Sequence, residues 1–274
     1  ADYAEGKAYN KKQLKKQLGL PNTAVPLIGL VSRLYDQKGL DLITCVMEDI
    51  VREDLQMVIL GTGDLRYEEA FRYYAAEYRE KVASVIGFDN RLAHRIYAGC
   101  DLFLMPSRFE PCGLSQMISM KYGTLPIVRE VGGLKDSVKS YNQYTGEGNG
   151  FSFTNYNAHD MLYTLRRALH FYYDDEKAFD RFRAIIYSMT KEERSHPEII
   201  NPSRKRRIAA GCGKQVEDVN KLLAQFKQMQ KMVKQIGGKG GPKMSKKMRR
   251  MMQQNPEMAE KLMGNVKGQN PFGF

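Results

Sequence analysis

Val25-Pro-Leu-Ile-Gly-Leu-Val31 is a continuous apolar run, and the polar segment Ser32-Arg33-Leu-Tyr-Asp-Gln-Lys38-Gly39 follows it directly. Continuous apolar runs suit strands that are buried on both faces, as in parallel sheets. Further runs lie at Gln56–Leu60, Ser84–Gly87, Leu102–Met105, Leu125–Val128 and Gly150–Phe153. Helical patterns lie between them, at about Gly39–Ile50, Tyr67–Ala83, Asn90–Ala98, Gly113–Tyr122 and Ala158–Tyr173. This alternation predicts an α/β domain with a doubly wound parallel sheet.

Polar clusters follow several of these predicted strands, at the edge where doubly wound sheets bind ligands. The first cluster places Arg33 and Lys38 beside a helix N-terminus, which suits a diphosphate. Taken alone, it also fits a solvated loop with two surface cations. The second cluster, Gly61-Thr-Gly63, is typical of a tight turn.

The other two clusters follow the fourth and fifth predicted strands. In Pro106-Ser-Arg-Phe-Glu110-Pro-Cys-Gly113-Leu-Ser-Gln, the Glu110 carboxylate can bind sugar hydroxyls, and the N–H groups of Gly113 and Leu114 can meet a phosphate. Alone, Glu110 also fits a helix-capping role. In Glu130-Val-Gly132-Gly133, the glycines allow the backbone to approach a ligand closely. Four such clusters at successive strand ends are more specific than any one of them.

Composition divides the 274-residue chain near Phe179–Thr190. Residues 1–180 carry 22 Lys and Arg against 24 Asp and Glu, whereas residues 181–274 carry 21 against 7. This asymmetry predicts a nucleic-acid or other anionic partner for the last third. No Gly/Ser linker separates the two parts.

Several classes of protein are disfavoured. No run of eighteen apolar residues predicts a membrane span, and the N-terminus has no signal-peptide pattern. Because the sequence starts with Ala1 and not Met, we expect it to begin within a longer protein. The four cysteines Cys45, Cys100, Cys112 and Cys212 form no C-x-x-C pair, which argues against a metal site and a disulfide scaffold and favours the cytoplasm.

The motifs of residues 1–180 resemble the C-terminal domain of bacterial glycogen (starch) synthases, which use ADP-glucose. The matching segments are Leu30–Gly39, His94–Asp101, Pro106–Leu114, Lys121–Arg129 and Gly132–Leu134, in the family's order and spacing. The resemblance implies a Rossmann-like domain that forms half of a GT-B glycosyltransferase. In that architecture a sugar nucleotide binds between two such domains, and no separate cofactor is needed.

By position, the resemblance implies a catalytic set of Arg33, Lys38 and Glu110. Arg33 and Lys38 would neutralise the diphosphate, and Glu110 would hold the glucosyl group. The implied substrate-binding residues are Phe88 (against adenine), Cys112, Gly113, Leu114, Gly132 and Gly133. His94 can be interpreted as a proton donor or, preferably, as a packing residue.

The family's N-terminal domain, which carries most of the acceptor groove, does not appear among these 274 residues. Half a cleft cannot exclude water or complete the charge stabilisation around the leaving diphosphate. We therefore expect weak nucleotide binding and little or no glucosyl transfer from these residues alone.

The sequence of the basic part, residues 181–274, predicts several helices. Thr190-Lys-Glu-Glu193 is a capping box, and Ser203–Ala210 predicts a short helix that Gly211 closes. Val216–Gln235 has helical spacing of apolar residues, which are Val219, Leu222, Leu223, Phe226, Met229 and Val233, followed by Ile236. Met229 and Met232 fit either a soft binding surface or, preferably, core packing.

Four consecutive cations, Arg204-Lys-Arg-Arg207, followed by Gly211-Cys-Gly213, suit a compact polyanion site such as one for RNA. They also fit a solvated charged helix. Residues 182–236 resemble the RNA-binding half of the M domain of the bacterial signal recognition particle protein, on Ser188–Arg194, Pro197–Gly213 and Val219–Leu223. The resemblance implies RNA contacts from Arg204 and Arg207, backbone approach at Gly211, Cys212 and Gly213, and support from Ser188, Glu193 and Gln215.

The sequence thus predicts a fusion. Its expected parts are a linker or docking segment (1–24), a nucleotide-sugar-binding domain (25–180), an RNA-binding segment (182–236) and a Lys/Met/Gly tail (237–274) that resembles a poorly ordered C-terminus. The GTPase and signal-peptide-groove motifs do not appear, so we expect RNA binding without signal-peptide capture. An alternative is an RNA-binding targeting component whose synthase-like part is inert. A recombined or misassembled reading frame is favoured over an evolved dual-function protein.

Overall fold

The computed structural model describes residues 3–144, 148–174, 188–190, 192–193, 196–212, 215–217, 219–220 and 223–224. We call residues 3–174 the sheet domain and residues 188–224 the helical segment, and each is described by itself. Some predictions fall outside the described residues. These are Gly213, Leu222, Phe226, Met229, Met232, Val233, Ile236, the junction residues 179–187 and the tail 237–274.

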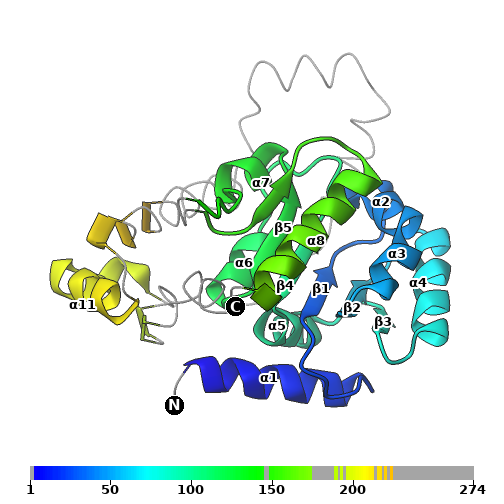
Figure 1. Cartoon of the computed structure of the whole chain (residues 1–274), viewed down its shortest axis with the longest axis horizontal. Coiled ribbons are helices and arrows are strands. Elements are labelled where there is room, and N and C mark those ends of the chain that lie inside the picture. Colours follow the sequence, from blue (N-terminus) through cyan, green and yellow to red (C-terminus); the bar gives the residue numbers. More distant parts are fainter. Residues whose placement is uncertain are drawn as a thin grey trace, which may run out of the picture. The chain divides into compact units, whose positions relative to one another are not determined.

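The sheet domain is built on six parallel strands (Figure 1). They are β1 Leu27–Val31, β2 Gln56–Gly61, β3 Val82–Ile86, β4 Leu102–Met105, β5 Leu125–Arg129 and β6 Phe151–Phe153. Their order in the sheet is β3-β2-β1-β4-β5-β6. The order reverses between β1 and β4, so the predicted doubly wound α/β architecture is confirmed.

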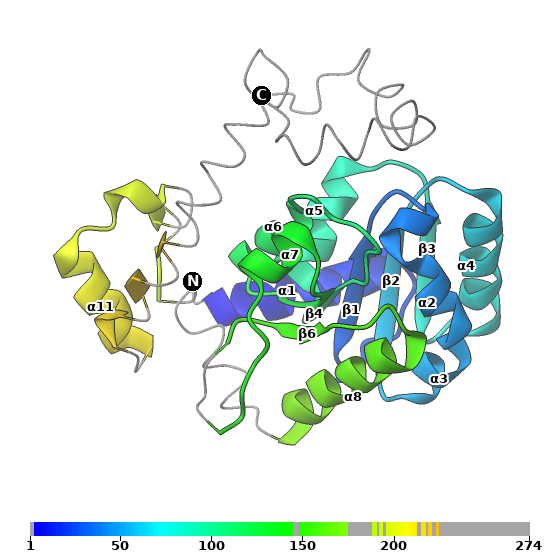
Figure 2. The ribbon, with the colours of Figure 1, turned by 90° about the horizontal axis from the view of Figure 1, so that it is seen from above.

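Helices cover both faces of the sheet (Figure 2). They are α1 Tyr3–Gln17, α2 Leu40–Cys45, α3 Met47–Arg52, α4 Leu65–Glu77, α5 Asn90–Gly99, α6 Ser115–Lys121, α7 Gly132–Ser137 and α8 Ala158–Asp174. Alternate strand residues enter two separate cores: Met57 packs with the α2, α3 and α8 side, and Val58 packs with the α1 and α5 side. This alternation follows from the two-residue period of a strand.

Several predicted boundaries are wrong in detail. The helix expected over Gly39–Ile50 is interrupted at Val46, whose N–H bonds to Ile43 O at 3.2 Å and so divides α2 from α3. The helix expected over Tyr67–Ala83 ends at Glu77, because its last residues begin β3. No helix was predicted at Gly132, yet α7 begins there, and Leu134 anchors it in a small apolar cluster with Val128.

The first helix docks on the sheet domain through lysines spaced four apart. Lys7 Nζ donates to Tyr122 O at 3.0 Å, Lys11 Nζ lies 2.6 Å from Asp101 Oδ2, and Lys15 Nζ donates to Thr23 O at 2.9 Å. Residues four apart share one helix face. Burial, with the nearby charge of Lys11, lowers the pKa of Lys15 to about 8. The segment 3–17 is therefore part of this domain's packing.

The helical segment has its own small core. The 3₁₀ helix η2 spans Pro197–Ile199 and α11 spans Pro202–Cys212. The buried residues of this core are Met189, Ile200, Ile208, Ala209, Val219 and Leu223. The predicted helix start at Ser203 is late by one residue, because α11 begins at Pro202, where Asn201 caps it by accepting from Arg204 N at 2.9 Å.

The predicted capping box of the helical segment is present. Thr190 N donates to Glu193 Oε2 at 2.8 Å, and Glu193 N donates to Thr190 Oγ1 at 3.2 Å. Within the described ranges, no helix is long and apolar enough to cross a bilayer, and no group of three or more His, Cys, Asp or Glu could hold a metal ion. The four cysteines are free thiols.

Candidate functional site

Three loops meet at the carboxyl ends of the parallel strands. Arg108 N donates to Gln37 O at 2.9 Å, which joins the loop after β4 to the loop after β1. Gly133 N donates to Glu110 O at 3.1 Å, which joins the loop after β5 to the loop after β4. The clusters that the sequence places on separate strand ends thus form one connected surface.

Lys38 and Glu110 are in direct contact at the centre of this surface. Lys38 Nζ lies 2.6 Å from Glu110 Oε2, although 72 residues separate them in sequence. Ser107 Oγ donates to the same oxygen at 3.3 Å, and Glu110 is only 8 % exposed. An ammonium and a carboxylate side by side can bind a phosphate and a hydroxyl of one ligand.

Glycines let the loops approach each other. A Cβ on Gly39, whose φ is 70°, would lie 2.0 Å from Pro106 O. A Cβ on Gly133 would lie 1.9 Å from Cys112 O, and one on Gly132 would lie 2.2 Å from Glu110 O. The close approach predicted for Gly132 and Gly133 is made to the backbone that carries Glu110 and Cys112. These glycines therefore set the position of that loop.

The loop continues through Cys112 and Gly113 into α6. Cys112 is half-buried, and burial together with the Glu110 charge raises the pKa of its thiol. Gly113 has a φ of 65°, and its carbonyl accepts from the buried Gln116 Nε2 at 2.9 Å. Leu114 is the residue before α6, so the helix begins two residues later than predicted.

Sequence reasoning missed Arg129, at the end of β5. Its guanidinium donates to three backbone carbonyls, those of Ser107 (3.0 Å), Arg108 (2.7 Å) and Thr154 (3.2 Å). Burial lowers the pKa of Arg129. The available signal was its place at the end of the segment Lys121–Arg129, because bonds to backbone carbonyls cannot be inferred from residue types.

Tyr156, which sequence reasoning also missed, supports the same loops. The guanidinium carbons of Arg108 and Arg129 lie 4.8 and 5.3 Å from the centre of its ring, and its hydroxyl donates to Asp41. Tyr156 thus links the loop after β6 to α2 and to the loop that carries Glu110.

Other residues that the sequence predicts for the site make fewer contacts with the loops around Glu110. The Arg33 side chain is exposed and has no hydrogen-bond or ion-pair partner among the described residues. Phe88 follows β3 and is 91 % exposed. His94 packs edge-on against Tyr97 and Tyr122, as the packing interpretation expects. The tight turn predicted at Gly61 and Gly63 is not present, because Gly61 ends β2 and Gly63 pairs with Leu34 in a parallel β-bridge. A Cβ on either glycine would meet the backbone of Ser32 or of Leu34.

In the helical segment, two predicted RNA contacts pair with one carboxylate. Arg207 Nη2 bonds to Glu193 Oε2, and Arg204 Nη1 lies 3.6 Å from Glu193 Oε1. Burial favours a raised pKa for Glu193, but the bonds from Arg207 and Thr190 outweigh it and hold that pKa below its ordinary value. Glu193 is 1 % exposed, whereas the arginine side chains remain 37 % (Arg204) and 50 % (Arg207) exposed. Glu193 therefore binds the cations but leaves their outer faces accessible.

The remaining predicted residues of this segment differ in exposure. Ser188 O accepts from Arg207 Nη1 at 2.8 Å, and Ser188 Oγ lies against Gly211. Gly211 and Gln215 are exposed, whereas Cys212 is buried and its thiol donates to Ala209 O. The cysteine side chain is thus turned away from solvent.

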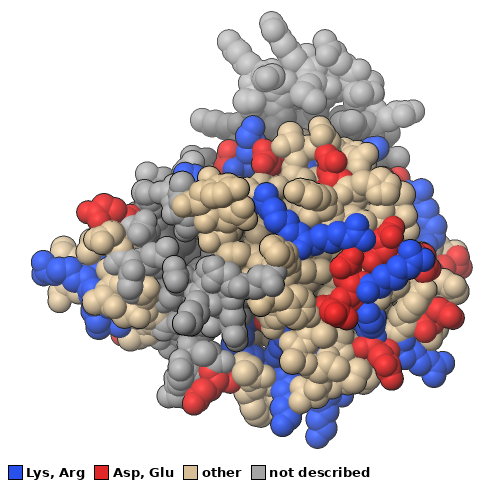
Figure 3. All heavy atoms as spheres, viewed as in Figure 1, with Lys and Arg blue, Asp and Glu red and all other residues tan. Residues whose placement is uncertain are grey.

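The sheet domain and the helical segment differ in the distribution of charged side chains on their surfaces. On the face of the sheet domain that Figure 3 shows, cations and carboxylates are intermixed over the described residues. On α11, residues 204–207 are all cations, and Arg206 and Arg207 are exposed. Among the described residues of the helical segment, these four consecutive cations form a short basic stretch of α11.

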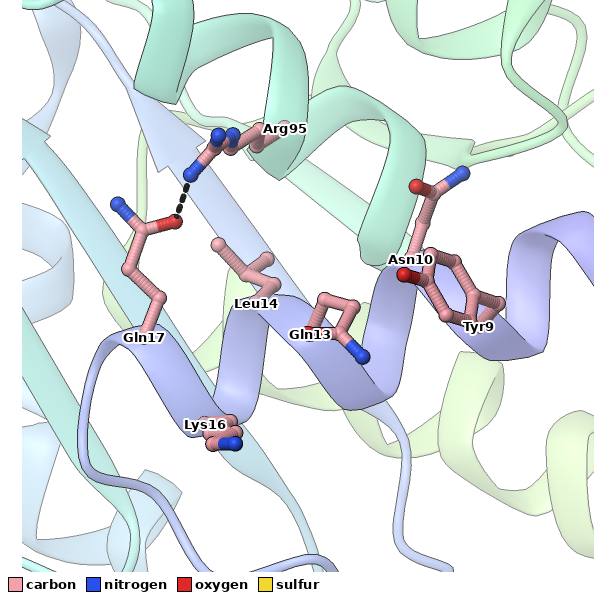
Figure 4. Close-up of a pocket in the computed structure, with 7 residues that line it drawn as sticks. All are labelled: Tyr9, Asn10, Gln13, Leu14, Lys16, Gln17 and Arg95. Carbon is pink, nitrogen blue, oxygen red and sulfur yellow. Dashed lines mark hydrogen bonds between the residues drawn. The ribbon is translucent and has the colours of Figure 1, made fainter.

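A separate pocket of about 490 Å³ lies between α1 and α5 (Figure 4). Its lining is Tyr9, Asn10, Gln13, Leu14, Lys16, Gln17 and Arg95. It lies along α1, which contacts Asp101 just before β4, at the amino ends of the strands. None of the predicted site residues lines it, so it is distinct from the surface around Glu110.

Comparison with known proteins identifies the sheet domain. The family model "Glycosyl transferases group 1" matches residues 10–182, more than half of the chain. The chain belongs to this family. Within it, the chain is similar to the glycogen synthase of Geobacillus thermodenitrificans, with 64 % identity over 169 residues. That match covers 61 % of this chain and 35 % of the relative, so the chain spans about a third of the length of the synthase it matches.

Solved glycosyltransferase structures agree with this assignment. The catalytic domain of starch synthase IV from Arabidopsis thaliana, bound to ADP and acarbose, is 34 % identical with a TM-score of 0.64, over 76 % of this chain and 44 % of that one. The C-terminal domain of a group 1 glycosyltransferase from Francisella tularensis is 17 % identical with a TM-score of 0.52, over 68 % and 94 % of the two chains. The second likeness shows the fold alone. The sheet domain is a glycogen synthase-like glycosyltransferase region with half of the GT-B architecture.

A second family model, "Signal peptide binding domain", matches residues 160–255 and fits the expectation of a fusion. It overlaps the glycosyltransferase match at residues 160–182. In the structure, α8 lies within that overlap and packs Met161, Leu162 and Leu165 into the core of the sheet domain. Residues 160–174 are therefore structurally part of the glycosyltransferase domain.

Proposed function

We propose that the sheet domain binds ADP-glucose as the donor-binding half of an α-1,4-glucan-elongating glucosyltransferase. The observation that carries this proposal is the contact of Lys38 with Glu110 at the carboxyl edge of the sheet. In the proposed complex Lys38 and Arg33 meet the diphosphate, and Glu110 accepts from glucosyl hydroxyls. The starch synthase IV structure, which holds ADP and acarbose, supports this choice of ligand.

The remaining predicted residues have consistent roles in the proposed complex. Phe88 offers an exposed aromatic face on which adenine can stack. The backbone N–H groups of Gly113 and Leu114 contribute donors, and Cys112 lies beside the glucosyl group. Gly132 and Gly133 hold the backbone of the Glu110 loop in place.

Titration with ADP-glucose tests this proposal. We expect weak, saturable binding of ADP-glucose to the 274-residue chain and little transfer of glucose to glycogen. Arg33→Ala should weaken binding, whereas Arg79→Ala, at an exposed arginine that donates to Ala76 O, should not. Equal affinity of the wild type and the Arg33→Ala variant would contradict the assigned role, and rapid turnover would contradict the expected lack of transfer.

A second function is proposed for the helical segment, which is binding of the signal recognition particle RNA. The supporting observation is the pair Arg204 and Arg207, ordered by Glu193 and partly exposed on α11. If roughly four phosphates are neutralised, the logarithm of the affinity should fall with the logarithm of salt concentration with a slope of about −3.

The RNA proposal is tested by electrophoretic shift or anisotropy with the particle RNA. Arg207→Ala should reduce affinity more than Arg206→Ala, which removes the same charge from the next position. Equal losses would indicate charge-driven binding without a defined site. An affinity that does not depend on salt, or no binding at all, would remove the proposal.

Paired titrations also separate the two readings of the fusion. Binding of both ligands by one chain supports two active parts. Binding of RNA without ADP-glucose supports the alternative, in which the glycosyltransferase part is inert. Sequencing across Phe179–Ala184 in genomic reads tests whether the junction is a recombined reading frame.

A further inference from the structure

We infer that Glu110 makes the site prefer a nucleoside diphosphate sugar over the free nucleoside diphosphate, by competing with the diphosphate for Lys38. This inference rests on the function proposed for the sheet domain. Its basis is the 2.6 Å contact between Lys38 Nζ and Glu110 Oε2, in a position where both side chains are largely shielded from solvent. The ammonium that the proposed diphosphate needs is already bonded to a carboxylate.

The surroundings of Glu110 make that competition significant. Oε2 accepts from Lys38 and from Ser107 Oγ, and Ser107 is itself 1 % exposed. Oε1 has no hydrogen-bond partner among the described residues. A diphosphate that draws Lys38 away leaves a shielded carboxylate with one neutral donor, and an unpaired buried charge is costly.

A sugar nucleotide offsets this cost and a free nucleoside diphosphate does not. Hydroxyl groups of the sugar can donate to Glu110, which replaces the bond that Lys38 gives up. A free nucleoside diphosphate carries additional negative charge on its terminal phosphate and has no glycosyl hydroxyls that could donate to Glu110. The ion pair between Lys38 and Glu110 therefore lowers the affinity for the free nucleoside diphosphate more than the affinity for the nucleoside diphosphate sugar.

The loop network keeps Glu110 in place during this exchange. Gly133 N donates to Glu110 O, and Arg129 donates to the carbonyls of Ser107 and Arg108. Because the backbone on both sides of the carboxylate is fixed, Glu110 cannot simply follow Lys38 toward the phosphates. The flexible Lys38 side chain therefore moves toward the diphosphate, and the Glu110 carboxylate stays where it is.

The test is calorimetric titration of the full chain with ADP and with ADP-glucose, in the wild type and in Glu110→Gln, Glu110→Asp and Lys38→Gln. Glu110→Gln removes the charge that holds Lys38, so affinity for ADP should rise about five-fold, as expected for loss of one partly shielded ion pair. The preference for ADP-glucose over ADP should fall by at least that factor. Glu110→Asp keeps the charge but withdraws it from Lys38, so the preference should fall in that variant as well.

The double variant Lys38→Gln with Glu110→Gln distinguishes release of Lys38 from direct repulsion between Glu110 and the diphosphate. We expect no gain in ADP affinity there, because no lysine remains to be released. A gain of the same size would show direct repulsion between Glu110 and the diphosphate and would overturn the inference. Equal effects of Glu110→Gln on both ligands, or no effect on either, would also overturn it.

Failure of the proposed function is distinguishable from failure of this inference. A wild type that binds neither ligand overturns the proposed function and this inference with it. A wild type that binds both, with an unchanged preference in Glu110→Gln and Glu110→Asp, overturns the inference alone. Thermal melts of each variant confirm that the comparison is made between folded proteins.

Discussion

The Arg129 guanidinium donates to the backbone carbonyl of Arg108 at 2.7 Å, so a side chain at the end of β5 fixes the backbone that leads to Glu110. Two further carbonyls, of Ser107 and Thr154, accept from the same group. Arginine suits this position because its planar group presents five donors in a fixed arrangement.

Replacement of Arg129 by lysine should therefore be costly, although the charge is kept. We expect the free energy of unfolding to fall by about 1–3 kcal/mol, because a lysine cannot satisfy three carbonyls in different directions. Urea unfolding measures this change. Arg166→Lys, which alters an exposed ion pair with Glu53, is the control and should cost about 0.5 kcal/mol or less. Equal costs in the two variants would contradict a special role for Arg129.

A methyl group at Gly133 should displace the Glu110 loop. The added Cβ would lie 1.9 Å from Cys112 O, a backbone atom that cannot move without its loop. We expect Gly133→Ala to lower the melting temperature and to weaken ADP-glucose binding.

The control for that substitution is Gly6→Ala. Gly6 lies within α1 with nothing within 4 Å of an added Cβ. Alanine there should stabilise the helix by up to about 1 kcal/mol. If the two variants behaved alike, the steric explanation for Gly133 would be wrong.

Lys15 should give the domain a pH dependence in the alkaline range. Its pKa is about 8 in the folded protein and near 10.5 in the unfolded chain, so the unfolded state binds more protons between these values. Stability attributable to Lys15 must then rise as pH increases from about 8 to 10.5. The difference in unfolding free energy between the wild type and Lys15→Met should move in favour of the wild type over this range. Lys16→Met removes the same charge from the exposed neighbouring position and serves as the control.

Glu193→Gln should destabilise the helical segment at neutral pH. The pKa of Glu193 is held below its ordinary value, so the stability it provides is present at neutral pH and is lost as pH falls below about 4.5. We expect a cost of about 1–2 kcal/mol at pH 7, since the arginine partners are partly exposed, and a smaller cost in acid. Hydrogen exchange of the α11 amides measures it, with Glu198→Gln at an exposed position as the control. A cost that does not change with pH would argue against the ionised pair.

Much of the fold was predictable because local patterns and tertiary packing agree. The run Leu102–Met105 predicted β4 at both ends, since a parallel strand buried on both faces reads as an apolar run. The start of α7 was not predictable, because Gly132 and Gly133 have low helix propensity and the helix depends on the packing of Leu134. Here tertiary contacts override the local preference.

The sequence allowed candidate site residues to be proposed one by one, but it did not show how they connect. Lys38 and Glu110 were each assigned to a ligand, yet no pattern indicates that they bond to each other, because the contact is created by the order of the strands. Likewise, Thr190 and Glu193 were predicted as a capping box, whereas the bond from Arg207 to the same carboxylate depends on how α11 packs.

The docking of α1 has a practical consequence for anyone preparing fragments of this protein. Lys15 is fully buried, and Leu14 lies in the core beside α5. A fragment that begins at Val25 would therefore expose an apolar surface on α5, and Asp101 would lose its ion pair with Lys11. A fragment that starts upstream of Tyr3 should remain in solution, whereas the shorter one should aggregate.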